Sequence, residues 1–219
     1  MTSTNSSLRL VVLGAGGRVG RAVVAEAVSR GHRVTAVVRD PAKYADLASD
    51  SVTVVRGDAT DPRSVAAVAA GHDAAVNASV RLDVPSEEYL VSAAKALIEG
   101  LAEAGVARLV VLGIATTLET SPGVRIMDAP DFPEQYRLFS QGHVAELETL
   151  AGAGGGLDWL MVVPPMDLDA AAPRTGRYRS AVGTAIEGPG HIAHPDLAVA
   201  VLDEIEEPRH SRVQLAVSD

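Results

Sequence analysis

The chain has 219 residues, of which 47% are apolar, 21% charged and 3% aromatic, as is typical of a soluble globular domain with an aliphatic core. The net charge of −9 argues against nucleic acids and anionic membranes as partners. The absence of cysteine excludes disulfides, thiolate catalysis and zinc–thiolate sites.

The N-terminus, MTSTNSS, is polar and lacks the apolar core of a signal peptide. We therefore expect residues 1–7 to be a flexible tail and the protein to be cytoplasmic. No apolar run reaches the ~18 residues that a transmembrane helix needs.

Short apolar runs that alternate with helical patterns make up the rest of the chain. The predicted strands are 8–13, 34–38, 52–55, 73–77, 108–112, 157–163 and 212–217. The predicted helices are 18–29, 41–48, 61–71, 86–104, 133–151 and 194–208. Residues 166–190 have no clear period and are predicted to form a loop with short pieces of strand.

This alternation predicts an α/β fold: a Rossmann-type, doubly wound parallel sheet with helices on both faces. The strands are almost entirely apolar, as parallel strands buried on both faces should be. We expect a single domain over residues 8–219, with a small substrate region formed by 114–136 and 165–195.

Four glycines, Gly14, Gly16, Gly17 and Gly20, lie between the first predicted strand and the first predicted helix. Glycine lets the backbone approach a pyrophosphate closely, and the helix N-terminus offers free N–H groups. The spacing is Gly14-x-x-Gly17-x-x-Gly20. The alternative motif Gly-x-Gly-x-x-Gly, starting at Gly14, would need a glycine at position 19, which is Val19. The position in a βαβ unit favours dinucleotide binding over a glycine-rich turn that binds nothing.

The end of the second predicted strand bears on the choice between NAD and NADP. Arg39 follows that strand, and Arg18 lies inside the glycine turn. Two guanidiniums suit a 2′-phosphate, so NADP is the preferred cofactor. Asp40 could serve NAD instead, and the alternative for both arginines is that they are solvated surface charges.

Several motifs occur along the chain in the same order as in one protein family. After the glycine turn come GDATDP at 57–62, NAS at 77–79, RLVVLGIATTLE at 108–119 and LDWLMVVPP at 157–165. Together they resemble the atypical short-chain dehydrogenase/reductases of the NmrA-like, NAD(P)H-binding group, and in particular the biliverdin-IXβ reductases. The resemblance covers residues 8 to about 217.

The resemblance implies that Asp58 binds the adenine amino group, with Ala59 beside the ring. It also implies that residues 77–79 lie along the ribose and phosphate of the cofactor. The expected cofactor-binding residues are Gly14, Gly16, Gly17, Arg18, Val19, Gly20, Arg39, Asp58, Ala59, Asn77, Ala78 and Ser79.

Better-known members of the family carry a Tyr-x-x-x-Lys pair, which passes a proton to the carbonyl oxygen. The residues four positions after the four tyrosines of this chain are Ala48, Ala93, Ser140 and Val182. The pair is therefore absent, which argues against ordinary alcohol dehydrogenation. Atypical relatives lack it too and still reduce substrates, with the proton coming from solvent or another side chain.

Three residues are candidates for the proton donor or for an orienting group: Thr117, Tyr136 and His143. Thr117 follows the fifth predicted strand, and its alternative role is a turn hydroxyl that caps the backbone. The alternatives are a packed aromatic for Tyr136 and a surface or packing histidine for His143. His194, Pro195 and Asp196 are predicted to start a helix, and no metal site is expected from His191 and His194.

The predicted pocket walls suggest a small apolar or aromatic acceptor. They hold Ile114, Leu118, Met127, Phe132, Met166 and Leu168. The leading interpretation is an NAD(P)H-dependent oxidoreductase that transfers a hydride to such a molecule. The alternatives are an NAD(P)-binding redox sensor without turnover and a biosynthetic isomerase or cyclase. The sequence leaves homo-oligomer formation open.

Overall fold

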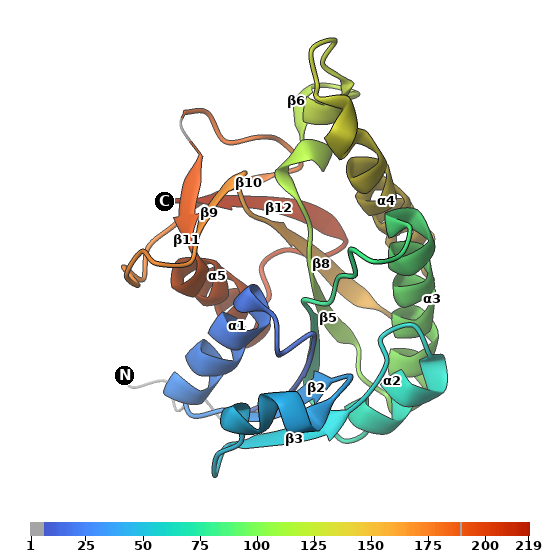
Figure 1. Ribbon diagram of the computed structural model, residues 1–219, viewed down its shortest axis with the longest axis vertical. Coiled ribbons are helices and arrows are strands. Elements are labelled where there is room, and N and C mark those ends of the chain that lie inside the picture. Colours follow the sequence, from blue (N-terminus) through green and yellow to red (C-terminus); the bar gives the residue numbers. More distant parts are fainter. Residues whose placement is uncertain (1–6, 189) are drawn as a thin grey trace.

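The computed structural model describes residues 7–188 and 190–219. Within this part of the chain, the central sheet has the strand order β10-β12-β8-β5-β4-β1-β2-β3 (Figure 1). Neighbouring strands are parallel except at one edge, where β10 runs antiparallel to β12. The strands of this sheet are β1 Arg9–Leu13, β2 Arg33–Val38, β3 Val52–Arg56, β4 Ala74–Asn77, β5 Arg108–Leu112, β8 Asp158–Val163, β10 Arg179–Val182 and β12 Val213–Ser218.

Helices cover both faces of the sheet. The helices α1 and α5 pack together on one face, and α2, α3 and α4 pack side by side on the other (Figure 1). Their bounds are α1 Arg18–Ser29, α2 Pro62–Ala69, α3 Ser86–Ala104, α4 Glu134–Ala151 and α5 His194–Glu206. The expected doubly wound Rossmann-type fold is confirmed.

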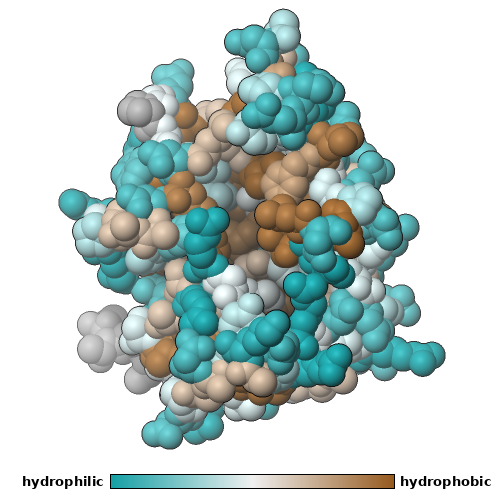
Figure 2. All heavy atoms as spheres, viewed as in Figure 1, coloured by the Kyte–Doolittle hydropathy of each residue, from teal (hydrophilic) through white to brown (hydrophobic). Residues whose placement is uncertain are grey.

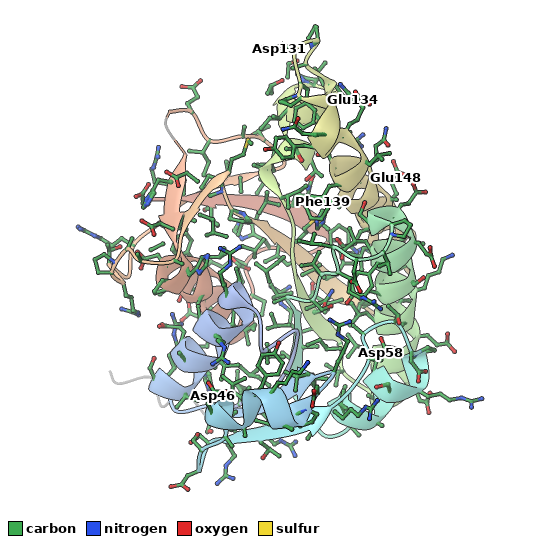
Figure 3. All side chains as sticks on the ribbon, in the orientation of Figure 1. Asp46, Asp58, Asp131, Glu134, Phe139 and Glu148 are labelled. Carbon is green, nitrogen blue, oxygen red and sulfur yellow. The ribbon has the colours of Figure 1, made fainter. Side chains whose placement is uncertain are left out.

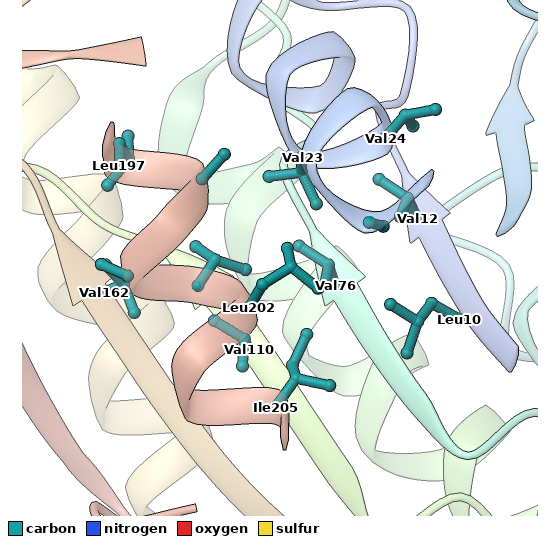
Figure 4. Packing of buried hydrophobic residues seen from close by; sticks show 14 of the residues in the cluster. Leu10, Val12, Val23, Val24, Val76, Val110, Val162, Leu197, Leu202 and Ile205 are labelled. Atoms are coloured by element: carbon teal, nitrogen blue, oxygen red, sulfur yellow. The ribbon is translucent and has the colours of Figure 1, made fainter. Parts of the chain in front are cut away.

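Alternation along the strands separates two hydrophobic cores. Leu10 and Val12 of β1 point to the α1–α5 face, whereas Val11 and Leu13 point to the α2–α4 face, because successive strand residues face opposite sides. Figure 4 shows the first core, with α1 and α5 packed over the strands. These interlocking aliphatic cores hold the sheet edge, and therefore the site, in a fixed geometry.

Several short elements differ from the expectation. Residues 41–48 form a 3₁₀ segment, η1 Pro41–Leu47, which is interrupted by a non-helical backbone conformation at Tyr44. Two small sheets, β9–β11 and the hairpin β6–β7, stand beside the main sheet. Their strands are β6 Glu119–Ser121, β7 Val124–Arg125, β9 Asp167–Asp169 and β11 His191–Ala193. The remaining short helical turns are η2 Ala115–Thr117 and η3 Ile126–Asp128.

The expected flexible tail falls, apart from Ser7, outside the described residues. Within the part of the chain that is described, no helix combines the length and apolar character needed to span a membrane. The parallel strands all end at one edge of the sheet, so the segments that follow β1, β2, β3, β4, β5 and β8 converge there. This edge contains the candidate site.

Candidate cofactor and substrate site

The glycine turn after β1 is held on both sides by backbone. The N–H groups of Gly14 and Ala15 donate to the carbonyl of Val37, at 3.2 and 3.3 Å, and thereby join the turn to β2. Gly14 has a φ of +76°, which favours glycine. A Cβ atom at Gly14 would lie 2.6 Å from the backbone of Ala78 and Ser79. The turn is therefore packed against the segment that follows β4.

The other three glycines serve different purposes. A Cβ at Gly20 would clash with the carbonyl of Gly14 and lie 2.9 Å from the Cα of Ala15, so Gly20 lets α1 approach the turn. At Gly16 the added Cβ would lie 2.6 Å from Cζ of Tyr44. At Gly17 the nearest atom, the carbonyl oxygen of Gly14, is 3.4 Å away. The backbone at Gly17 is thus open to a ligand.

Gly17 is also the N-cap of α1, and no side chain caps the helix there. The first N–H groups of a helix have no partner within the helix, and the helix dipole adds a partial positive charge. The open backbone at Gly17 and this uncapped helix start together form a place for a phosphate.

A pocket of about 510 Å³ opens beside the glycine turn. Figure 2 shows that the face of the molecule seen in Figure 1 is hollowed near its centre. Of the predicted cofactor-binding residues, those that line the pocket are Gly14, Gly16, Gly17, Arg39, Asp58, Ala59, Ala78 and Ser79. The structure therefore brings together segments that follow four neighbouring strands.

The lining of this pocket is cationic although the chain is acidic. Three cations, Arg39, Lys43 and Arg81, face two carboxylates, Asp40 and Asp58, which gives a net charge of +1. The whole chain carries −9. A local excess of positive charge in an acidic protein favours an anionic ligand at this place.

Asp58 is held in its ionised form. Burial acts to raise its pKa, but hydrogen bonds from the backbone and side chain of Thr60, and the charges of Arg81 and Arg39, lower it overall. Both bonds from Thr60 go to Oδ1, at 2.9 and 2.7 Å. Oδ2 has no hydrogen-bond partner among the described residues, so it can accept a bond from a ligand.

The segment after β4 is organised by a buried amide. Oδ1 of Asn77 accepts from the backbone N–H and the hydroxyl of Ser79, at 3.2 and 2.6 Å. The hydroxyl of Tyr89 in turn donates to Oγ of Ser79 at 3.0 Å. Asn77 does not line the pocket, whereas Ser79 and Tyr89 do. Asn77 therefore shapes the wall that the ligand would meet.

Arg18, Val19 and Gly20 lie outside the lining of this pocket. Val19 packs against the core between α1 and α5. Arg18 is exposed, and its charge lowers the pKa of His194 at the start of α5. Arg18 therefore lies within electrostatic range of the start of α5. Contact of these three residues with a cofactor remains a prediction.

Lys43, Tyr44, Arg81 and Tyr89 are among the lining residues that were not predicted. The first two belong to η1 after β2, and Arg81 belongs to the loop after β4. Their position in the sequence could have indicated Lys43, Tyr44 and Arg81, because residues shortly after a parallel strand lie at the edge of the sheet where ligands bind.

In Figure 3, Asp58 and Asp46 lie at the end of the molecule that holds β2 and β3, whereas Phe139 lies on α4.

A second pocket, of about 270 Å³, lies at the ends of β8 and β12. None of the described residues that line it is charged. Those residues are Ala115, Leu118, Ile126, Val163, Pro165, Met166, Ala185, Ile186, Gly188, Gly190, Ala216, Val217 and Ser218. Most of these residues belong to the predicted substrate region, 114–136 and 165–195, and two of the six apolar residues named for its walls, Leu118 and Met166, line the pocket.

Thr117 is 1% exposed and fully engaged within the fold. Its hydroxyl donates to the carbonyl of Ile114 at 2.9 Å and accepts from Nε2 of Gln214 at 2.7 Å. This matches the role of a hydroxyl that stabilises the turn after β5. A catalytic role for Thr117 remains a prediction that would need this network to open.

The other two candidates lie on α4 but in different surroundings. His143 is 4% exposed, its Nδ1 is 3.0 Å from Oε2 of Glu146, and its ring makes an edge contact with Phe139. Burial raises the pKa of Glu146, with His143 opposing it. Tyr136, in contrast, is 48% exposed. Thr117, Tyr136 and His143 thus differ in their surroundings, and the turn that holds Thr117 contacts α4 through a hydrogen bond from Thr116 to Ser140 at 2.9 Å.

The late histidines make separate contacts. As predicted, α5 starts at His194 with proline in its first turn. Nδ1 of His191 is 2.7 Å from Oδ2 of Asp219, whereas Nε2 is 3.7 Å from Asp169. Over residues 7–188 and 190–219, no group of three or more acidic or histidine side chains is placed to hold a metal ion.

Comparison with known proteins places this arrangement in a family. The family model described as NAD(P)H-binding matches residues 14–208. The uncharacterized protein YwnB of Bacillus subtilis is 32% identical over 216 residues, which are 96% of this chain and 98% of YwnB.

Two solved structures are similar along nearly the whole chain. A Burkholderia pseudomallei protein that has been suggested to be exported is 35% identical, with a TM-score of 0.86 and coverage of 97% of this chain and 100% of that chain. A Streptococcus pneumoniae protein for which NADH-flavin reductase activity has been suggested is 27% identical, with a TM-score of 0.81 and the same coverage. The chain therefore belongs to the NAD(P)H-binding family, in agreement with its resemblance to the atypical, NmrA-like NAD(P)H-binding group.

Proposed function

We propose that this protein is an NAD(P)H-dependent oxidoreductase that transfers a hydride to a small, apolar or aromatic organic acceptor. The observation that carries the proposal is the pairing of two pockets at one sheet edge. One is cationic and opens on a bare glycine turn, and the other is apolar and uncharged.

The first pocket supports a dinucleotide. A pyrophosphate is accommodated at Gly17, where a side chain is missing and the helix N-terminus is uncapped. Asp58 offers a free carboxylate oxygen to the adenine amino group. Arg39 at the end of β2 supports a preference for NADP over NAD, because a guanidinium can bind a 2′-phosphate through two bonds.

The second pocket supports the acceptor class. Aliphatic side chains of Leu118, Val163 and Met166 offer dispersion contacts, and no lining charge among the described residues would pair with an anionic substrate. Its volume of about 270 Å³ suits a molecule of one or two rings. The apolar lining also limits access of water to a reacting centre.

A bound nicotinamide cofactor would supply the hydride, and the reaction is balanced by one proton for each hydride transferred. The chain itself positions the two reactants. Because Thr117 and His143 are engaged in internal hydrogen bonds, we propose that solvent delivers the proton.

The test mixes the protein with NADPH or NADH and with each member of a panel of quinones, flavins, enones and carbonyls. Oxidation of the cofactor is measured as loss of the nicotinamide absorbance band. Gly17→Val is the matched control, because a Cβ at this position makes no contact closer than 3.4 Å, to the carbonyl oxygen of Gly14, but the side chain would occupy the proposed phosphate position. We expect turnover with neutral ring compounds and none in the control. Turnover that is equal in the control would refute the proposed site.

The second candidate function is a redox sensor that binds NAD(P) without turnover. The burial of two candidate proton donors, Thr117 and His143, favours it. The same experiment separates the two. If the protein binds either nucleotide in a titration but oxidises neither with any member of the panel, the sensor is the better description.

A further inference from the structure

The loop between β4 and α3 carries an arginine that the glycine-turn motif does not include. Arg81 lines the cofactor pocket, and Asp83 does not. The two side chains form an ion pair of two bonds, Nε to Oδ1 at 2.9 Å and Nη2 to Oδ2 at 2.5 Å. Asp83 is the more exposed partner, at 64% of its side chain against 33% for Arg81.

Arg81 and Arg39 line the same pocket from different elements. Arg39 follows β2, whereas Arg81 follows β4, and both line the cavity. Both charges act on the carboxyl of Asp58, whose pKa they lower, and on the hydroxyl of Tyr89. Arg39 also contributes to the low pKa of Asp83, after the larger effect of Arg81 itself. The two guanidiniums therefore lie within electrostatic range of the same groups.

Two guanidiniums that line one cavity repel one another, so each is stabilised by a nearby anion; Arg81 has Asp83 beside it, and both arginines act on Asp58. A phosphate monoester carries close to two negative charges at neutral pH, and the planar fork of arginine binds phosphate through two parallel hydrogen bonds. A ribose hydroxyl offers no charge to either arginine. The pocket is thus built for a phosphate more than for a free ribose.

We propose that Arg81 is the second arginine that binds the 2′-phosphate of NADPH, facing Arg39 across the pocket, and that Asp83 competes with this phosphate for Arg81. The proposal rests on the proposed function, since it assumes that a dinucleotide binds in this pocket. It replaces Arg18, which does not line this pocket, as the partner of Arg39.

If Asp83 competes with the phosphate for Arg81, substitutions of these two residues should change the affinity for NADPH in opposite directions. Arg81→Gln removes the phosphate contact and should weaken NADPH binding about tenfold, the size expected of a charge-assisted hydrogen bond. Asp83→Asn frees Arg81 and should strengthen NADPH binding about two- to fivefold, because an exposed ion pair is weak. NADH binding should change less than about twofold in both.

The experiment measures dissociation constants of NADPH, NADH, 2′,5′-ADP and 5′-ADP for each variant by titration calorimetry. Arg209 and Glu207 supply the matched control, because they form an exposed arginine–carboxylate pair at the same spacing of two residues, with Nη2 2.7 Å from Oε2. Arg209→Gln and Glu207→Gln should leave all four constants unchanged. Arg18→Gln tests the rival arginine.

The outcomes separate this inference from the proposed function. Absence of NADPH, NADH and 5′-ADP binding by the unmodified protein would refute the dinucleotide pocket itself. If those ligands bind, equal losses of NADPH and NADH in Arg81→Gln would overturn the role of Arg81. Weaker NADPH binding in Asp83→Asn would overturn the competition, because it would mean that Asp83 holds Arg81 in the binding position.

Discussion

The aromatic ring of Tyr44 lies against the backbone of Gly16, so closely that a Cβ there would be 2.6 Å from Cζ of the ring. The guanidinium carbon of Arg21 lies 5.7 Å from the ring centroid on the same tyrosine. Arg21 also donates to Asp46 at 2.6 Å and to the carbonyl of Gly16 at 3.3 Å. Since η1 has no buried residue, these contacts hold it beside the glycine turn.

Tyr44 should therefore support both dinucleotides alike. It lines the pocket and covers the turn, and it does so through its ring rather than through a charge. Tyr44→Ala should weaken NADPH and NADH about equally, by roughly five- to tenfold, as loss of a packed aromatic face would. Tyr44→Phe should retain most of the affinity in the same calorimetric titrations. A selective loss of NADPH in Tyr44→Ala would show that the residue acts on the 2′-phosphate instead.

Gly17 and Gly20 should respond in opposite ways to substitution. Gly20→Ala places a methyl group against the carbonyl of Gly14, so we expect a loss of about 2 kcal/mol or more in unfolding free energy. Gly17→Val should leave stability within about 1 kcal/mol, because a Cβ there meets the carbonyl oxygen of Gly14 only at contact distance, 3.4 Å, yet abolish nucleotide binding. Urea unfolding and a nucleotide titration of the same samples test both. Normal binding by Gly17→Val would move the phosphate site elsewhere.

Arg39 should distinguish the two cofactors. Its loss removes a charge-assisted contact to phosphate, of the order of 1.5–3 kcal/mol, which corresponds to roughly tenfold to a hundredfold in NADPH affinity. Arg39→Ala should leave NADH binding nearly unchanged. The ratio of the two dissociation constants is the measurement, and an equal loss for both nucleotides would mean that Arg39 does not bind the 2′-phosphate.

Local patterns sufficed for the regular part of the fold. The parallel strands and the long helices are each strongly apolar or strongly periodic over many residues, and Gly105 ends α3 in the left-handed conformation that glycine favours. The edge strand β10 could not be predicted in this way. Its four residues are mostly exposed, and only pairing with β12 defines it.

In the site, too, features set by neighbouring residues could be predicted from the sequence, whereas features set by contacts distant in sequence could not. The glycine turn is local, so its position and spacing could be predicted. The surroundings of Thr117 depend on Gln214, which is distant in sequence, and those of His143 depend on burial of α4. Arg81 lines the pocket from a loop and Tyr44 from η1, and neither segment carries a recognisable motif; both follow strands whose ends meet at the site.

Glu26 should stabilise the fold by binding Arg174, which belongs to the loop that precedes β10. It is 5% exposed and accepts hydrogen bonds from Arg30 at 2.8 Å and from Arg174 at 2.9 Å. Glu26→Gln should reduce the unfolding free energy by about 2 kcal/mol, below the usual cost of breaking a buried pair, because Arg30 keeps Asp203 and Glu206. Glu207→Gln, in an exposed pair, should cost less than about 0.5 kcal/mol. Equal effects of the two substitutions in urea unfolding would contradict this ranking.

His194 should make the folded protein less stable in mild acid. It is 6% exposed, and burial, together with the charge of Arg18, lowers its pKa below the ordinary value of 6.5, with Asp169 opposing. The unfolded chain therefore takes up a proton near pH 6.5 while the folded chain does not. Stability contributed at this position is full above pH 6.5 and is lost as the pH falls toward the lower pKa of the folded state.

The measurement is the urea midpoint of the unmodified protein and of His194→Gln at pH 7.5 and pH 5.0. Glutamine does not titrate, so the stability of His194→Gln relative to the unmodified protein should increase on acidification, while the other five histidines contribute equally to both. In an Arg18→Gln background this increase should shrink, because removing the neighbouring cation lets His194 accept a proton in the folded state. A relative stability that stays constant between the two pH values would show that His194 is free to protonate where it lies.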